Sequence, residues 1–142
     1  MKCSKNDIKV LTQQLGREPR SVVKIIRKCQ KGYPQVIVTA PILKQRDKVS
    51  IFPTTFWLTC PELNYRIGKL ETKGLVKEIK AKIDEDEGLT KRLDQAHKDY
   101  AKYRLDLIGE EELKSFQESH PGQYRVLKES GVGGILDFDG IK

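Results

Sequence analysis

Two cysteines and one histidine carry the most reactive side chains of this sequence. Cys29 ends a β-branched run, Cys60 follows an aromatic run, and His97 lies four residues after Leu93 in a segment with helical periodicity. Thiolate and imidazole are preferred zinc ligands and bind it in a tetrahedral arrangement. Cys29, Cys60 and His97 are therefore candidate zinc ligands, or the centre of a small metal- or thiol-dependent enzyme.

The same residues have a structural interpretation. Their spacing does not resemble a paired C-x-x-C motif, and free cysteine is among the most buried residue types. On this interpretation Cys29 and Cys60 are small buried hydrophobes and His97 makes a hydrogen bond in the core. With Cys3 the chain has an odd number of cysteines at low density, which favours reduced thiols and a cytoplasmic location.

The second candidate site is a basic run near the N-terminus. Residues 1–50 hold 12 Lys and Arg against 3 Asp and Glu. A clustered positive field attracts anions, so an anionic ligand or an acidic protein is an expected partner. Nucleic acid is an alternative partner, because Tyr33 lies beside the run, although no recognised nucleic-acid motif is present. A solvated surface without a partner is the remaining interpretation. The candidate anion-binding residues are Arg17, Arg20, Lys24 and Lys28.

Composition limits the class of protein. The chain has 142 residues, of which 33% are charged and 37% hydrophobic, with a mean hydropathy of −0.56. This balance is typical of a folded protein, and the length predicts one domain over residues 1–142. No apolar stretch approaches the roughly 18 residues of a membrane span, and the N-terminus lacks the apolar core of a signal peptide. We expect no membrane association.

The elements that would position the thiols are three predicted strands. In an up-down-up arrangement the first and third strands are parallel, so Cys29 and Cys60 would emerge at the same sheet edge, about 5 to 10 Å apart. Residues 43–48 are expected to form an exposed connection. The predicted strands are residues 22–29, 35–40 and 54–59.

Helices are predicted on both sides of this sheet. Ser4 and Asp7 form a capping-box pattern before a short helix that ends at Gly16. Later helices are predicted from Pro61 to Gly74 and over residues 75–83, 89–107 and 110–116, with a last turn at 124–127. The expected main core contains Leu63, Ile67, Leu93 and Tyr100. The predicted fold class is α+β, a small antiparallel three-stranded sheet preceded by a short helix and followed by several helices.

Several stretches together resemble a bacterial family known as domain of unknown function 501. They are residues 14–20 (QLGREPR), 27–29 (RKC), 52–54 (FPT), 57–61 (WLTCP) and 96–97 (AH), with further single matches between residues 10 and 107. The resemblance implies no activity, substrate or cofactor. It does imply a Cys-Leu-His segment after the counterpart of Lys142, which indicates a truncated C-terminus or a member without this tail.

The sequence therefore supports three hypotheses. The first is a binding or regulatory domain whose basic face recognises an anionic or protein partner. The second is the metal- or thiol-dependent enzyme described above, with zinc as its cofactor. The third is a nucleic-acid-binding module.

Overall fold

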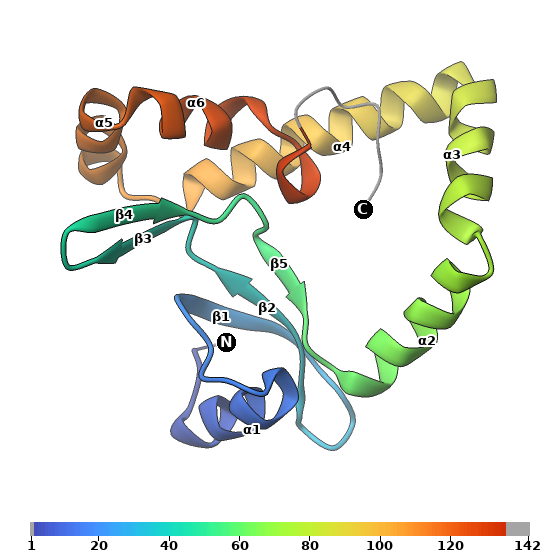
Figure 1. Cartoon of the computed structure of the whole chain (residues 1–142), viewed down its shortest axis with the longest axis horizontal. Coiled ribbons are helices and arrows are strands. Elements are labelled where there is room, and N and C mark those ends of the chain that lie inside the picture. The colour runs from blue at the N-terminus through green and yellow to red at the C-terminus, as the bar shows by residue number, and fades with distance from the viewer. Residues whose placement is uncertain (1, 136–142) are drawn as a thin grey trace. The chain divides into compact units, whose positions relative to one another are not determined.

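The computed structural model describes residues 2–135. Contacts divide the chain into two compact units, each made from two separate stretches of sequence. The first unit combines residues 1–40 with 55–73, and the second combines 41–54 with 74–142. Figure 1 shows the order of the elements along the chain. The expectation of a single domain is not tested by this division and stays a prediction.

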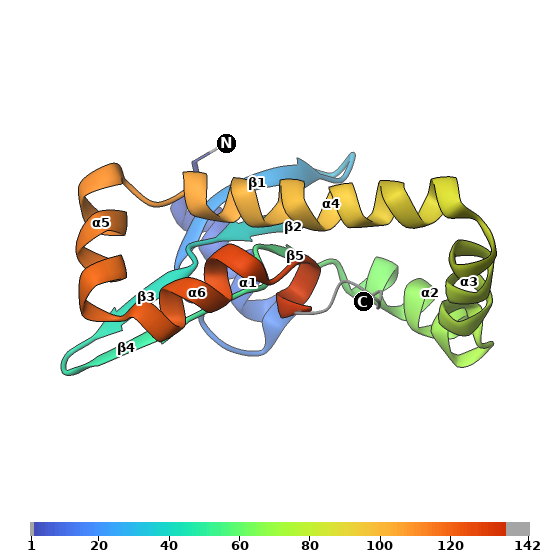
Figure 2. The same ribbon diagram turned by 90° about the horizontal axis from the view of Figure 1, so that it is seen from above.

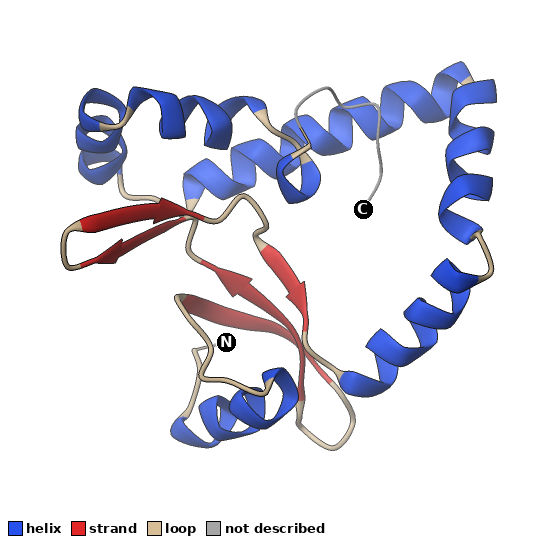
Figure 3. Ribbon diagram, viewed as in Figure 1, coloured by secondary structure: helices blue, strands red, loops and turns tan. Residues whose placement is uncertain are grey.

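A three-stranded antiparallel sheet forms the centre of the first unit (strands in Figure 3). Its strands are β1 (Val22–Lys28), β2 (Pro34–Thr39) and β5 (Phe56–Leu58), in the order β1-β2-β5. The predicted hairpin and the pairing of the third strand are confirmed. β1 is an edge strand, and its register against β2 shifts at three points.

Two helices belong to this unit. α1 (Lys5–Leu15) begins with the predicted capping box: the Ser4 hydroxyl accepts from the Asp7 N–H, and the Asp7 carboxylate accepts from the Ser4 N–H. α1 ends at Gly16, whose φ of 69° is the left-handed conformation that glycine adopts readily. Its Leu11 packs on the sheet and is fully buried. α2 (Pro61–Thr72) starts with proline in the first turn, as predicted.

The second unit begins with a hairpin that the sequence did not indicate. β3 (Ile42–Gln45) and β4 (Lys48–Ile51) pair as antiparallel strands. The prediction that residues 43–48 form an exposed connection is therefore wrong in part, although the turn itself is exposed. Each strand has only four residues, and the two-residue turn Arg46-Asp47 lacks the glycine that usually indicates a hairpin.

Helices make up the rest of the second unit. α4 and α6 are in contact, and they run side by side in the view of Figure 2. The last predicted turn is a full helix, because Pro121 both ends α5 and opens α6. The helices are α3 (Leu75–Glu85), α4 (Glu87–Asp106), α5 (Glu110–Ser119) and α6 (Pro121–Glu129), followed by a 3₁₀ turn, Val132–Gly134.

The predicted fold class is confirmed, but the predicted core is wrong. Ile67 is 44% exposed, and Leu63, Leu93 and Tyr100 are only partly buried. Apolar residues at helical spacing do not all reach a core here, because each unit has its own small core. These cores contain Leu11, Ile25 and Ile37 in the first unit and Ile108, Phe116 and Leu127 in the second.

Among residues 2–135 there is no helix with the length and apolar character that crossing a membrane requires.

Candidate functional site

The positive charge of the chain is concentrated in the first unit. This unit contains 12 Lys and Arg against 4 Asp and Glu, whereas the second contains 15 against 16. The predicted anion-binding residues Arg17, Arg20, Lys24 and Lys28 all belong to the first unit. An anionic partner would therefore be attracted mainly to this unit.

Lys28, one of the predicted anion-binding residues, has a carboxylate partner. Its Nζ lies 2.7 Å from Oδ1 of Asp7, and only 7% of the Asp7 side chain is exposed. The hydrogen bond from Lys28 and the bond from the Ser4 backbone lower the pKa of Asp7 to about 2, although burial acts in the opposite direction. Lys28 thus neutralises a buried charge and fastens β1 to α1.

The remaining cations lie along β1 and the loop before it. Arg17 and Arg20 are exposed in this loop, and its end is fixed by the bond from Ala40 N–H to the Ser21 oxygen, at 2.8 Å. In β1, Lys24 lies opposite Val38 and Arg27 opposite Val36. Val36 and Val38 are two residues apart in β2 and therefore lie on the same face of the sheet. Their partners Lys24 and Arg27 lie on that face as well.

Simple alternation along the strand predicts something different, namely Lys24 and Lys28 together with Arg27 opposite. The register shifts of β1 instead bring Arg27 to the face of Lys24. We call Arg17, Arg20, Lys24 and Arg27 the basic face. Within residues 2–135, no ion pair joins Arg17, Arg20 or Arg27 to a carboxylate.

The two candidate thiols lie at corresponding positions in the first unit. Cys29 directly follows β1, and Cys60 follows β5 by two residues and precedes the first turn of α2. β1 and β5 are both antiparallel to β2, so they run in the same direction and end on the same side of the sheet. β2 separates them, which corresponds to two strand spacings, or about 10 Å. Both thiols are half-buried.

His97 belongs to the second unit, where it contributes to the packing of α4. It is fully buried, and its Nδ1 accepts a hydrogen bond of 2.9 Å from the Val132 N–H. Because Nδ1 accepts, the proton of a neutral ring is on Nε2. No group of three or more His, Cys, Asp or Glu side chains within residues 2–135 is arranged to hold a metal ion. The zinc hypothesis for Cys29, Cys60 and His97 stays a prediction.

Arg104 is the largest fully buried side chain in the described part of the chain. Its guanidinium donates five hydrogen bonds of 2.5 to 3.0 Å, four to backbone oxygens and one to a hydroxyl. Nε donates to the backbone oxygen of Pro53, and Nη2 donates to that of Gly131. Nη1 donates to the backbone oxygens of Leu127 and Ser130 and to the Ser130 hydroxyl. Burial lowers the pKa of Arg104, and the Tyr100 ring, 5.2 Å from the guanidinium carbon, partly offsets this.

His97 and Arg104 therefore form a buried polar cluster that holds the segment after α6 against α4. The donors of Arg104 are taken up by protein acceptors, so the cluster is suited to stabilising the fold rather than to binding an anion. Sequence reasoning missed Arg104. The one available signal was its spacing: His97, Ala101, Arg104 and Ile108 recur at helical intervals and are all buried.

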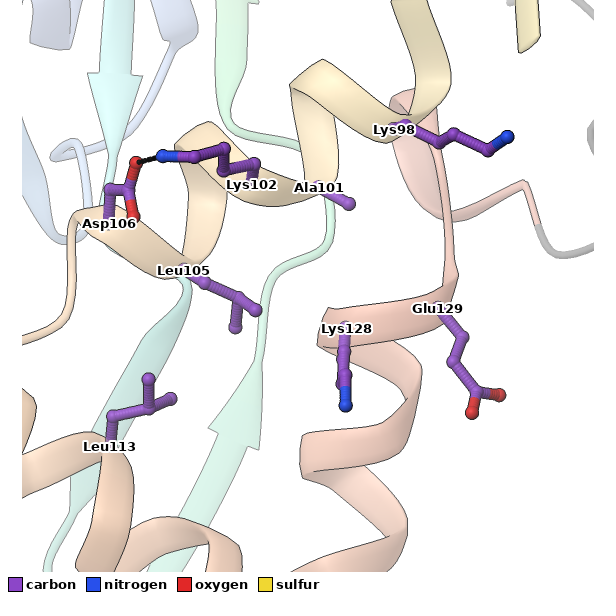
Figure 4. Close-up of a pocket in the computed structure, with 8 residues that line it drawn as sticks. All are labelled: Lys98, Ala101, Lys102, Leu105, Asp106, Leu113, Lys128 and Glu129. Carbon is purple, nitrogen blue, oxygen red and sulfur yellow. Dashed lines mark hydrogen bonds and ion pairs between the residues drawn. The ribbon is translucent and has the colours of Figure 1, made fainter. Parts of the chain in front are cut away.

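The second unit also has a shallow hollow of about 560 Å³ between α4, α5 and α6 (Figure 4). Its apolar lining is Ala101, Leu105 and Leu113, and lysines lie at its rim. Two of these lysines already have partners: Lys98 bonds to Asp94 and Lys102 to Asp106. The charges are thus balanced locally, and the hollow does not favour an anion.

Comparison with known proteins agrees with the resemblance seen in the sequence. No curated protein and no solved structure matches this chain. A family model described as a protein of unknown function, DUF501, matches residues 25–142. This range includes Cys29, Cys60 and His97 but not the loop that carries Arg17 and Arg20. Because the match covers more than half of the sequence, the chain belongs to the DUF501 family of proteins of unknown function.

Proposed function

We propose that this chain is a binding domain whose basic face recognises an anionic partner. The observation that carries the proposal is the separation of charge, with 12 Lys and Arg against 4 acidic residues in the first unit and near balance in the second. Such a field raises the local concentration of an anion and the rate of its association. Two of the four acidic residues, Asp7 and Glu62, are already paired with cations of their own unit.

A competing explanation applies to β1 itself. Charged side chains and bulges on an edge strand prevent pairing with the edges of other sheets, and β1 has both features. This explanation accounts for Lys24 and Arg27 but not for Arg17 and Arg20, which lie outside the strand. Only the binding explanation therefore predicts that replacing Arg17 and Arg20 weakens the affinity for an anion.

The test replaces Arg17, Arg20 and Arg27 by Gln and measures binding to heparin and to a mixed-sequence RNA. Lys28 stays unchanged because its pair with Asp7 stabilises the fold. The matched control replaces Lys77, Arg92 and Lys114 by Gln, which removes the same charge from exposed positions of the second unit. We expect the first variant to lose affinity about tenfold or more at low salt and to show a shallower dependence on salt than the unchanged chain.

Equal losses in the two variants would show that only net charge matters and would contradict a basic face. Binding to RNA but not to heparin would instead favour the nucleic-acid module. Both variants should keep the melting temperature of the unchanged chain, since the substituted side chains are exposed.

A second candidate function uses the thiols. It is favoured by one observation, that Cys29 and Cys60 follow parallel strands at one end of the same sheet. We expect a zinc- or thiol-dependent activity of Cys29 and Cys60 to show itself as zinc-dependent stabilisation and protection of the thiols from alkylation. Cys3 offers the internal control, because alkylation of Cys3 should not respond to zinc.

A further inference from the structure

The register of β1 against β2 identifies two residues that have no place in the regular pairing. Val22 lies opposite Thr39 and Lys24 opposite Val38, so Val23 is an extra residue between consecutive partners. Ile25 lies opposite Ile37 and Arg27 opposite Val36, so Ile26 is a second extra residue. Each is the additional residue of a β-bulge, a feature that redirects side chains and is often found at sheet edges and beside functional sites.

These two bulge residues are both exposed and apolar. Val23 is 42% exposed and Ile26 is 44% exposed, whereas Ile25 between them is fully buried in the core under α1. Protection of a sheet edge does not require exposed apolar side chains at the bulges, because charged residues and the bulges themselves already prevent pairing. Val23 and Ile26 flank β2 partners that are two residues apart, Val38 and Val36, which corresponds to about 7 Å along the sheet.

Cations surround this apolar pair in the sequence. Arg20 precedes Val23, Lys24 and Arg27 flank Ile26, and Lys31 follows in the loop after β1. Tyr33, which is 51% exposed, lies in the same loop. The surface therefore offers positive charge and branched aliphatic side chains together.

We infer that the partner of the basic face is an acidic protein segment that also carries apolar side chains, with Val23 and Ile26 contacting the apolar groups and Arg20 and Arg27 pairing with the carboxylates. This inference rests on the proposed function. Branched aliphatic side chains neither stack on nucleobases nor bind phosphates, so a nucleic acid would leave Val23 and Ile26 unused. A second copy of the chain is disfavoured as the occupant of this edge, because two such positive surfaces repel one another.

The experiment compares three probes on the full chain: a 12-residue peptide that alternates Glu and Leu, the same peptide with Ser for Leu, and heparin. We expect the Glu-Leu peptide to bind about tenfold or more tightly than the Glu-Ser peptide, because only the former can bury apolar surface against the bulges. Peptide affinities within about twofold of each other would overturn the inference.

Two double variants separate the apolar from the ionic contribution. Val23→Thr with Ile26→Thr keeps the β-branched shape that suits a strand but replaces a methyl group of Val23 and the ethyl group of Ile26 by a hydroxyl. We expect this variant to lose about tenfold in affinity for the Glu-Leu peptide and to keep its heparin affinity within about twofold. The matched control is Val76→Thr with Ile79→Thr, at positions of the second unit that are 39% exposed, and it should bind every probe unchanged.

Arg20→Gln with Arg27→Gln should weaken binding of all three probes. If this variant weakens heparin binding while Val23→Thr with Ile26→Thr leaves the Glu-Leu peptide unaffected, the inference fails and the proposed function stands. If the Arg variant changes the binding of no probe, both fail. Circular dichroism and the melting temperature of each variant check that the sheet is intact, and a further pair, Val23→Ala with Ile26→Ala, repeats the comparison if the Thr variant unfolds.

Discussion

Arg104 on α4 holds Ser130, the residue directly after α6, through two hydrogen bonds of 3.0 Å, one to the backbone oxygen and one to Oγ. The same nitrogen donates to the oxygen of Leu127 within α6. Carbonyl groups at the end of a helix lack partners within the helix and carry partial negative charge. The buried guanidinium supplies both the missing donors and the opposite charge, so that the end of α6 is fastened to α4.

Replacing Arg104 by Met should destabilise the protein by at least about 3 kcal/mol. Met fills much of the same space but has no donor, and it leaves several buried carbonyl groups without their hydrogen bonds. Urea unfolding followed by circular dichroism measures the loss. Arg92→Met on the exposed face of the same helix is the control and should change stability by less than about 0.5 kcal/mol.

Gly131 is required for packing against His97. A β-carbon at position 131 would lie only 2.6 Å from Cγ of His97, although the backbone there has a negative φ of −90°. Gly131→Ala should therefore cost about 1 to 3 kcal/mol through steric overlap. The double variant with His97→Ala should recover part of this loss relative to the sum of the single changes, which a double-mutant cycle measures. Strict additivity of the two changes would contradict the contact.

Asp7 should make stability depend on pH in the acidic range. Its pKa in the folded protein is about 2, below the ordinary value of 3.8, so folding favours the carboxylate. The stabilisation, about 2 kcal/mol, is complete above about pH 5 and is lost as the pH falls through 4 towards 2. Denaturant unfolding at a series of pH values measures it. Asp7→Asn should be less stable at neutral pH and should lose most of this dependence, whereas Glu18→Gln, at an exposed position, should leave it unchanged.

Arg46 occupies the turn between β3 and β4 with a φ of 43°, a conformation that glycine and asparagine adopt more readily than arginine. Arg46→Asn should stabilise the second unit by up to about 1 kcal/mol, because the short amide side chain of Asn can hydrogen-bond to the neighbouring backbone in this conformation. A shift of the melting temperature upward checks this. Asp47→Asn in the same turn is the control, because Asp47 does not have a positive φ. A fall in the melting temperature of Arg46→Asn would show that contacts of the Arg46 side chain stabilise the turn more than the unfavourable φ destabilises it.

Local patterns in the sequence were sufficient for the secondary structure around the first unit. Ser4 and Asp7 predicted the start of α1, and Gly32 with Pro34 predicted the hairpin of β1 and β2, because caps and turns depend on residues close together in the chain. The β3–β4 hairpin escaped prediction because its turn contains Arg46 rather than a glycine. The family resemblance also came from the sequence, and the match over residues 25–142 confirms it.

Tertiary structure decided which residues are buried and which are presented to a partner. From the sequence alone, Arg104 is expected to be a surface cation. In the structure α6 and Pro53 place carbonyl oxygens around its guanidinium, and only such contacts between distant segments can satisfy a buried guanidinium. Likewise, alternation along β1 cannot reveal that Val23 and Ile26 are extra residues, since a bulge is defined by the register with the neighbouring strand. The sequence by itself determined the charge, the fold class and the helix caps. The pairing of β1 with β2 decided that Lys24 and Arg27 share one face and that Val23 and Ile26 are extra residues beside them.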